Sequence, residues 1–455
     1  MFDVTEVGDK VRELRATQRT EATVFDEVYG FMHGRLGRPT VPAGATGDIQ
    51  ELARLAVKNI MPLVVDTFAH ALSVDGFRSP SAEANGAAWG IWQRERMDAR
   101  QSEVHRPAVM YGAAYVIVAL EDSGEVGFRI RTPRQTVAEY TDPARDEWPI
   151  CALETWETGT GNKTVVHGVF YDDTNAYPVT FFGTSKSARW ELGDGTPHGF
   201  SVCPVVRFLN DYDPEDKVRG EVEPLIQDQR AINAVNFDRL VVSRFGAFPQ
   251  KYIMGWAPDT GTADGDEAYL QALSAMRVLA IDDPEAKAGA FPAASVTAYN
   301  EILQEMIVHA ALKARVNVSA LTGDISNVGA ETIALVDAPN QRKIGAKKRA
   351  FGESWEQALR LAATAENVDV SEDAEVVWAD TDPRSFAQVV DGISKLVATG
   401  VPVTSLLDQI PGLTQQKVDA ITEDVRTADA KSLAAQIVAS VRGGATDAAT
   451  SPAVA

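Results

Sequence analysis

The sequence has few of the residues and motifs on which catalysis, metal binding or membrane insertion depend. Its 455 residues include two cysteines, Cys151 and Cys203, which lie outside any CxxC or Cys/His spacing. This pattern gives no support to a disulfide framework or a zinc site, and it fits a reducing compartment in which both thiols are buried. No GxxxxGK(S/T), HExxH, GxSxG or helix-opening GxGxxG motif occurs, and the six histidines have no ligand spacing. We therefore expect no catalytic residue, no cofactor and no bound metal.

Long apolar runs are also missing. No stretch approaches the ~18 apolar residues of a membrane-spanning helix, and residues 1–6 lack the basic flank and apolar core of a signal peptide. We expect neither export nor membrane insertion. Apolar residues nevertheless make up 45% of the chain, and the length allows two or three folded domains at about 100–200 residues each.

Two helical segments enclose a short insert in the middle of the chain. The first, residues 221–245, has Pro224 in its first turn, where a missing N–H costs little. The second, residues 295–315, opens on a serine N-cap candidate and places its apolar residues on one stripe about 100° wide. The insert has two strand-like runs, 248–255 and 277–281, separated by a Gly/Asp/Thr-rich loop. The chain is expected to leave along one long helix, form a small α/β unit and return along another.

The remaining patterns predict a fold of the α+β class. Helical segments are expected over residues 2–34, 49–73 with an interruption at Pro62, 98–111, 331–364 and, as three helices, 385–441. Alternating segments bounded by turn residues predict strands of an antiparallel sheet over residues 115–120, 126–131, 136–140, 150–158, 163–171 and 178–184. A further strand is expected at 376–379, and residues 37–47 are expected to form a loop.

Several short segments, taken together and in order, resemble the portal proteins of tailed bacteriophages, of the SPP1 type found in siphophages of Gram-positive hosts. Residues Cys203 to Asn210 resemble the strand before the family's stem, Gly220 to Asn233 its first stem helix, and Phe245 to Gln250 its entry into the clip. Upstream segments also follow the family's order: Tyr29 to Gly34, Val64 to Arg78, Trp92 to Asp98 and Ala108 to Val116. The resemblance covers most of residues 25–360.

The resemblance implies a portal architecture for this α+β chain. The parts that it implies are a wing of helices and antiparallel sheet (1–219), a first stem helix (220–245), a clip (246–294), a second stem helix (295–316), a tunnel loop (317–330), a long helix and wing return (331–383) and a helical crown (384–442). The small residues that dominate 443–455 predict a disordered tail.

The resemblance also implies a structural function. The chain would be the subunit of a ring of twelve at one capsid vertex, the conduit for genome packaging and ejection. Its implied partners are the major capsid protein, the terminase large subunit, a head-completion or connector protein and the double-stranded DNA passing through the ring, with no membrane. It would lie in the virion, and in the host cytoplasm during assembly. ATP hydrolysis would belong to the terminase, in keeping with the missing phosphate loop.

The charge of the chain bears on this interpretation. With 64 acidic and 43 basic residues, its formal net charge is −21. Proteins hold nucleic acid nonspecifically by neutralising its phosphates, so this charge argues against tight binding to DNA. A channel that moves DNA must avoid holding it, and an acidic wall favours sliding. A surface that is acidic only to stay soluble is the alternative interpretation.

Candidate site residues follow from the implied architecture and the helical patterns. Glu301 and Glu305 lie opposite the apolar stripe of their helix and are predicted on the tunnel wall. The small polar residues predicted to face DNA from the tunnel loop are Asn317, Ser319, Thr322, Asp324, Ser326 and Asn327. The residues predicted at subunit interfaces interrupt the first stem stripe or form the densest basic cluster of the chain: Asp228, Arg239, Arg342, Lys343, Lys347, Lys348 and Arg349. A solvated face, or contact with DNA phosphates, is the alternative for the basic cluster.

Two functions of other classes compete with this interpretation. A metal-dependent hydrolase would use Asp211, Asp213 and Glu215, but the sequence offers no second cluster of histidines or carboxylates to converge on them. A non-portal assembly scaffold could share the acidity and the helices. It would not need a helix, an α/β insert, a returning helix and a small-residue loop in this order.

Overall fold

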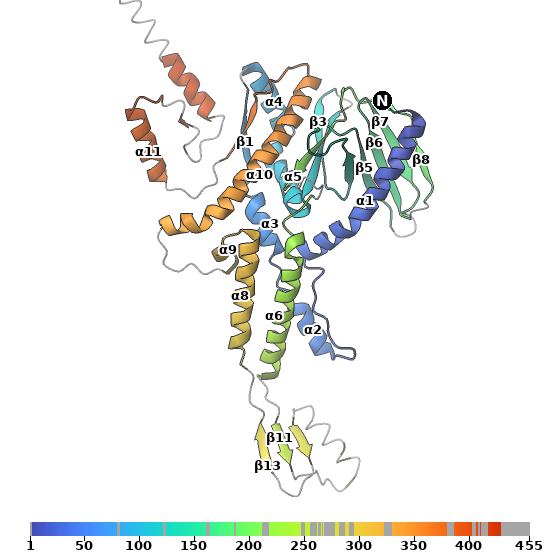
Figure 1. The fold of residues 1–455 in the computed structure, drawn as a ribbon, viewed down its shortest axis with the longest axis vertical. Coiled ribbons are helices and arrows are strands. Elements are labelled where there is room, and N and C mark those ends of the chain that lie inside the picture. The colour runs from blue at the N-terminus through green and yellow to red at the C-terminus, as the bar shows by residue number, and fades with distance from the viewer. Residues whose placement is uncertain are drawn as a thin grey trace, which may run out of the picture.

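A body of helices and antiparallel sheets carries two long helices that lead to a small sheet at the far end of the molecule (Figure 1). This computed structural model describes residues 2–79, 82–121, 124–160, 164–185, 188–211, 218–246, 251–254, 262, 265, 267, 278–281, 287–290, 295–322, 330–379, 386–402, 406–407, 410 and 417–428. Its helices and antiparallel sheets confirm the predicted α+β class.

One side of the body is a sheet covered by the N-terminal helix. The strands pair antiparallel in the order β4-β5-β6-β7-β8, and β9 also pairs with β7. Alternation along the strands buries one set of side chains under α1, where Val11 and Leu14 share a core with Leu153 and Phe170. An Asp3 and Glu6 capping box begins α1. The elements are α1 (Val4–Met32), β4 (Thr136–Glu139), β5 (Cys151–Thr158), β6 (Val165–Tyr171), β7 (Asn175–Phe181), β8 (Trp190–Leu192) and β9 (Thr196–Pro197).

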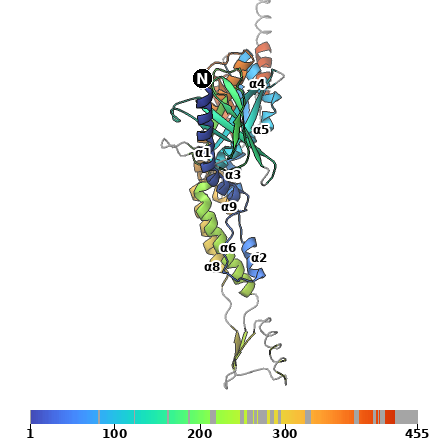
Figure 2. The same cartoon turned by 90° about the vertical axis from the view of Figure 1, so that its right-hand side faces the viewer.

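The other part of the body packs helices against two smaller sheets. One sheet has the order β10-β2-β3, and the other joins β1 to β14 across some three hundred residues of chain. The largest buried side chains of the main core include Trp92, Phe208 and Trp355. The elements are α3 (Met61–Ala69), β1 (Val74–Arg78), α4 (Ala82–Arg94), α5 (Met97–Tyr111), β2 (Ala113–Leu120), β3 (Val126–Arg131), β10 (Val205–Leu209), α10 (Ala330–Ala365) and β14 (Glu375–Trp378). Helix α4 lies on the side of the body away from α1 (Figure 2), whereas the last residue of α5, Tyr111, reaches Phe25 of α1.

The two long helices run side by side, as predicted. A 3-10 turn, η2 (Glu223–Leu225), holds Pro224 and leads into α6 (Ile226–Gly246), and α8 (Thr297–Ala314) packs against α6. We call α6 and α8 the helix pair. Their contact buries Ile232 against Leu303 and Ile307, which lie on the predicted apolar stripe of α8. Beside α6 lies α2 (Gly47–Leu55) (Figure 1).

The insert between the two helices forms a three-stranded sheet, called the distal sheet here. Strand β11 (Lys251–Met254) pairs parallel with β12 (Val278–Ile281) and antiparallel with β13 (Lys287–Ala290). The two predicted strands are confirmed, whereas β13 was not predicted because its Lys-Ala-Gly-Ala sequence has no β-branched or aromatic residue.

Two local predictions are refined by the structure. The interruption expected at Pro62 in the helical segment 49–73 is confirmed, but it lies just before the proline: α2 ends at Leu55 and α3 begins at Met61, with Pro62 in its first turn, where a proline loses no hydrogen bond. The segment from residue 317 was predicted as a loop that does not continue the second helix; α8 indeed ends at Ala314, and α9 (Val318–Thr322) is a separate short helix within that segment. The Asn317 side chain accepts a hydrogen bond from the Ser319 backbone N–H (3.0 Å), and α9 packs on α8.

The C-terminal region is described in part. Helix α11 (Phe386–Ala398) and a helix over residues 417–428 agree with two of the three helices predicted there. The predicted tail at 443–455 and residues 323–329 lie outside the described residues. Of the described helices, none is both long and apolar enough to cross a membrane. Cys151 and Cys203 are buried free thiols, as predicted.

Candidate functional site where the helix pair joins the body

The helix pair joins the body at a tight crossing of two backbone segments. The Glu221 N–H donates to the Val109 carbonyl at 2.8 Å, so the start of the helix pair lies directly on the end of α5. A Cβ atom on Gly220 would lie 2.2 Å from the Met110 carbonyl oxygen. Gly112, which follows α5, has φ of 102° and would place a Cβ 2.7 Å from the Arg219 carbonyl carbon. Only glycine allows the two segments to approach this closely.

A single buried carboxylate connects this crossing to α10. Glu221 is 8% exposed, and its carboxylate accepts hydrogen bonds from the ammonium groups of Lys347, at 2.7 Å, and Lys343. Lys343 also donates to the Ala314 carbonyl (3.1 Å), the last residue of α8. The carboxylate therefore connects the beginning of the helix pair to its end, through side chains of α10.

The surroundings of this carboxylate keep it ionised. Burial by itself raises the pKa of Glu221, but the two ammonium groups outweigh burial and hold the pKa below its ordinary value. Burial lowers the pKa of Lys347, and Glu221 offsets part of that effect. The ring of Phe68 lies 4.8 Å from the Lys343 ammonium and 5.2 Å from that of Lys347. The Asn210 amide donates to Glu221 at 3.2 Å and accepts from Lys347.

A row of amide side chains binds a second segment to α6. Gln229, Asn233 and Asn236 are spaced by four and three residues, so they lie on one face of the helix. The Gln229 amide donates to the Lys58 carbonyl at 2.7 Å and accepts from the Ile60 N–H at 2.9 Å. Asn233 accepts from the Lys58 N–H at 3.0 Å, and Asn236 donates to the Ala56 carbonyl at 2.8 Å. These buried bonds hold the backbone between α2 and α3 against the helix pair.

The two charged residues predicted at a subunit interface on α6 have partners within the chain. Asp228 pairs with Lys313 of α8 at 2.7 Å, and Lys313 also donates to the Pro224 carbonyl. Arg239 donates to the Asn300 amide oxygen of α8 at 3.2 Å. Both contacts connect α6 to α8 inside one subunit.

The predicted basic cluster divides between the two sides of α10. Lys347 was predicted at a subunit interface; the structure corrects this, because the helix turns it inward and it is 2% exposed. Lys343 likewise has its partner, Glu221, inside the subunit. Lys348 is half-buried and donates to the Ala379 carbonyl at 2.9 Å. Arg342 and Arg349 point away from the core and are exposed, so they stay candidates for contacts with a neighbour.

The residues predicted to line a tunnel are partly described. Glu301 and Glu305 are exposed on α8, where they line a shallow depression with Asn300, Gln304 and Val308. Asn317, Ser319 and Thr322 belong to α9 or its cap. Asp324, Ser326 and Asn327 lie outside the described residues, as do Asp213 and Glu215 of the hydrolase alternative. Among the residues described, no three His, Cys, Asp or Glu side chains are grouped to hold a metal ion.

Sequence reasoning missed Glu221, Asn210 and the amide row. The spacing of the amides was a usable signal, since a helix face of uncharged Gln and Asn favours buried backbone recognition over solvent. Glu221 carried no such signal, because its lysine partners lie more than 120 residues further along the chain.

Comparison with known proteins finds relatives along most of the chain. A family model described as "Phage portal protein, SPP1 Gp6-like" matches residues 50–431. The portal protein of Mycobacterium phage D29 is 26% identical over 379 residues, which cover 78% of this chain and 76% of that protein. The portal protein of Mycobacterium phage L5 is 24% identical over 362 residues, which cover 74% and 72%.

Solved structures also show similarity. A chain from the virion of a native gene transfer agent (GTA) particle matches 84% of this chain and 99% of its own length, with 14% identity and a TM-score of 0.47. A chain from the neck of an empty GTA particle, computed with C6 symmetry, matches 79% and 90% with 12% identity and a TM-score of 0.47.

Proposed function

Because the chain belongs to the family of SPP1 Gp6-like phage portal proteins, we propose that it is the subunit of a ring of twelve that forms the portal at one vertex of a phage capsid. Family membership makes it a structural protein of the virion and not an enzyme, and it implies a homo-oligomeric ring. The ring is the conduit through which the genome is packaged and later ejected.

In this proposal each part of the fold has a position in the ring. The helix pair is the stem, the distal sheet is the clip, the body is the wing, and α11 with the helix over 417–428 belongs to the crown. The tunnel loop of this proposal is the segment 317–330, of which residues 323–329 lie outside the described residues. Glu301 and Glu305 stand on the channel wall, where their carboxylates repel phosphates and keep DNA from being held.

The observation that carries the proposal is the order of elements around the helix pair. Two antiparallel helices leave the body and return to it, and they carry a small sheet at their far end (Figure 1). A compact enzyme or a simple scaffold has no use for a sheet held at that distance. In a portal, a sheet projecting from the ring is positioned to contact proteins outside the capsid. We propose that it docks the terminase large subunit during packaging and a head-completion protein afterwards, while the body contacts the major capsid protein.

The junction at Glu221 suits this function. Packaging applies force to the clip, and the stem must pass that force to the wing without unfolding. Glycine crossings, a buried carboxylate and a row of amides attach the stem to the body at several independent points. Removal of one contact leaves the others in place.

Mass and shape test the proposal directly. Twelve copies of a 49.1 kDa chain give a ring of about 589 kDa. Native mass spectrometry of the purified full chain is expected to find that mass, and electron microscopy is expected to show rings with a central hole. Monomers at all concentrations, in the presence and absence of capsid protein, would contradict the proposal.

A further inference from the structure

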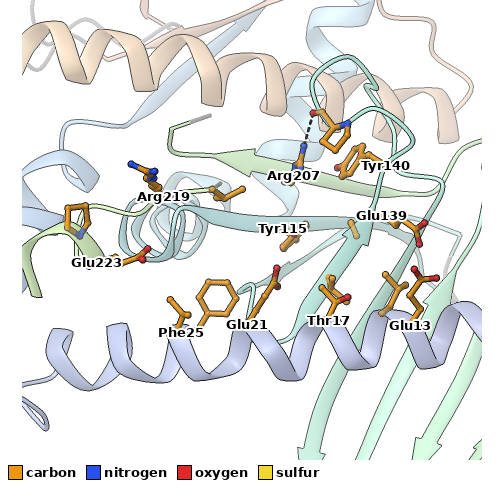
Figure 3. A pocket seen from close by; sticks show the side chains of 17 residues that line it. Glu13, Thr17, Glu21, Phe25, Tyr115, Glu139, Tyr140, Arg207, Arg219 and Glu223 are labelled. Atoms are coloured by element: carbon orange, nitrogen blue, oxygen red, sulfur yellow. Dashed lines mark hydrogen bonds between the residues drawn. The ribbon is translucent and has the colours of Figure 1, made fainter. Parts of the chain in front are cut away.

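Two adjoining hollows form a trough between α1 and α10, and Figure 3 shows the first of them. The first, about 740 Å³, lies between α1 and β10, and the second, about 810 Å³, between residues 140–147 and the C-terminal half of α10. The hollows share Tyr140, Pro143 and Arg207. The Arg207 guanidinium lies 4.0 Å from the centre of the Tyr140 ring and donates to the Pro143 carbonyl at 3.2 Å.

The trough is acidic. Its lining has nine carboxylates against four guanidinium groups, a formal excess of five negative charges. Some of these groups are paired within the chain, as Glu147 is with Arg360. Four exposed carboxylates make no ion pair or side-chain hydrogen bond with any residue that the structure describes: Glu223, Glu353, Asp369 and Glu372. Like charges gathered on a surface repel one another, and a cationic partner relieves that repulsion.

The opposite side of the body has an exposed cation on a strained backbone. Helix α4 lies on the side away from α1 (Figure 2), and Arg96 is at the corner between α4 and α5. Its φ of 55° and ψ of 37° are left-handed, which is uncommon and costly for a residue with a side chain. Arg94 and Arg100 nearby pair with Glu366 and Glu95. The Arg96 side chain, in contrast, has no ionic partner among the described residues.

We propose that the trough receives the α4–α5 corner of a neighbouring copy of this chain, with Arg96 entering among its unpaired carboxylates. The inference rests on the ring proposed above. A ring closed by rotation repeats one head-to-tail contact, in which a face of each subunit meets the opposite face of the next. The α4 side of the corner lies away from α1, which forms one wall of the trough, and the trough carboxylates and Arg96 have charges of opposite sign.

A second copy explains both features with one contact. The left-handed backbone at Arg96 ends α4 and begins α5, because its N–H donates to the Gln93 carbonyl and its own carbonyl accepts from the Ala99 N–H. What stays unexplained inside the subunit is the exposed guanidinium, which has no ionic partner among the described residues. The excess negative charge of the trough is likewise not neutralised by the described part of its own chain. A separate basic peptide would satisfy the trough and leave the Arg96 guanidinium without an ionic partner.

The test compares ring formation by the full chain and its variants across protein concentrations, by native mass spectrometry. Arg96→Gly removes the charge, and glycine adopts the left-handed backbone without strain, so the subunit is expected to fold at least as well as wild type. Glu353→Lys combined with Glu372→Lys reverses two trough charges at exposed positions. Each variant is expected to need an about fivefold higher protein concentration for half of the chains to enter rings.

Charge exchange makes the test specific for this pair of surfaces. Arg96→Glu alone is expected to weaken rings at least as much as Arg96→Gly. Combined with the two trough lysines, it is expected to restore ring formation toward wild type. The matched control is Glu157→Lys with Asp194→Lys, which makes the same charge change at two exposed positions outside the trough and is expected to leave ring formation unchanged.

The outcomes separate this inference from the proposed function. Rings of wild-type mass and affinity in both the Arg96→Gly and the trough variants would overturn the contact and leave the portal assignment standing. So would trough variants that lose only the binding of an oligolysine peptide. Absence of rings from the wild-type chain would instead overturn the proposed function.

Discussion

Replacing Glu221 by glutamine is expected to destabilise the subunit more than replacing either lysine that it binds. Glutamine keeps the shape of the side chain but removes its charge. Lys347, 2% exposed, then stays buried without an ion-pair partner among the described residues, and Lys343 lies beside it. Removing one partner of a buried ion pair costs about 3–5 kcal/mol, because the remaining charge is neither solvated nor compensated.

Lys347→Met is expected to cost less, about 1–2 kcal/mol. In that variant Glu221 still pairs with Lys343, so no buried charge is left alone. The double variant Glu221→Gln with Lys347→Met removes both buried charges and is expected to be more stable than Glu221→Gln alone. The coupling between the two sites is then about 1–3 kcal/mol, as for residues in direct contact.

Urea unfolding of the wild type and the three variants measures these free energies. All four proteins are compared at one low concentration, because assembly into rings raises apparent stability. Equal losses for Glu221→Gln and Lys347→Met, or a double variant whose loss is the sum of both, would refute the reasoning. The carboxylate would then not be the group that holds the junction together.

Three further changes test other parts of the structure. Gly220→Ala places a Cβ atom 2.2 Å from a backbone oxygen and is expected to destabilise the subunit by about 3 kcal/mol or to prevent folding. Gly90→Ala is the control: its Cβ atom would have no neighbour within 4 Å, and the variant is expected to be more stable by up to about 1 kcal/mol. Thermal unfolding midpoints compare the two variants. Burial lowers the pKa of His105 from 6.5 to about 4. Below pH 6.5 the unfolded chain therefore binds a proton that the folded chain does not, and the free energy of unfolding falls by about 2 kcal/mol at pH 5 and about 3 kcal/mol at pH 4, relative to its value above pH 6.5. His105→Gln is expected to lose that part of the pH dependence, measured by urea unfolding between pH 7.5 and 5, and an unchanged slope would contradict it. Ser326→Lys adds a charge to the proposed tunnel loop of every subunit and is expected to slow DNA packaging at low salt without changing ring mass; equal packaging rates would mean that the loop does not approach DNA.

Much of the fold could be predicted from local patterns. A proline in the first turn and an apolar stripe are local signals, so the helix pair was predicted within about two residues of its observed bounds. Alternation likewise predicted β2 to β7 as strands. Pairings between distant segments were not predictable, since nothing local in β1 indicates that its partner, β14, follows about three hundred residues later.

The candidate site was harder to predict because its charges depend on distant partners. A lysine within a run of basic residues is normally solvated, so Lys347 was expected on the surface. Its burial is tolerated only because Glu221 and Asn210 accept its hydrogen bonds, and both come from other parts of the chain. The exposed Arg342 and Arg349 of the same run follow the ordinary expectation.

Two kinds of ion pair therefore act at different levels of this molecule, and salt distinguishes them. The Glu221 cluster is buried inside each subunit, whereas the proposed contact of Arg96 with the trough lies between subunits at exposed positions. The Debye length falls from about 8 Å at physiological salt to about 3 Å at 1 M, which screens exposed pairs and leaves buried ones nearly unchanged. Raising NaCl from 0.15 to 1 M is expected to shift ring assembly to higher protein concentration while the urea midpoint of the free subunit stays nearly constant. If the subunit loses stability in parallel with the ring, the junction is accessible to ions, and a buried cluster cannot be what attaches the helix pair to the body.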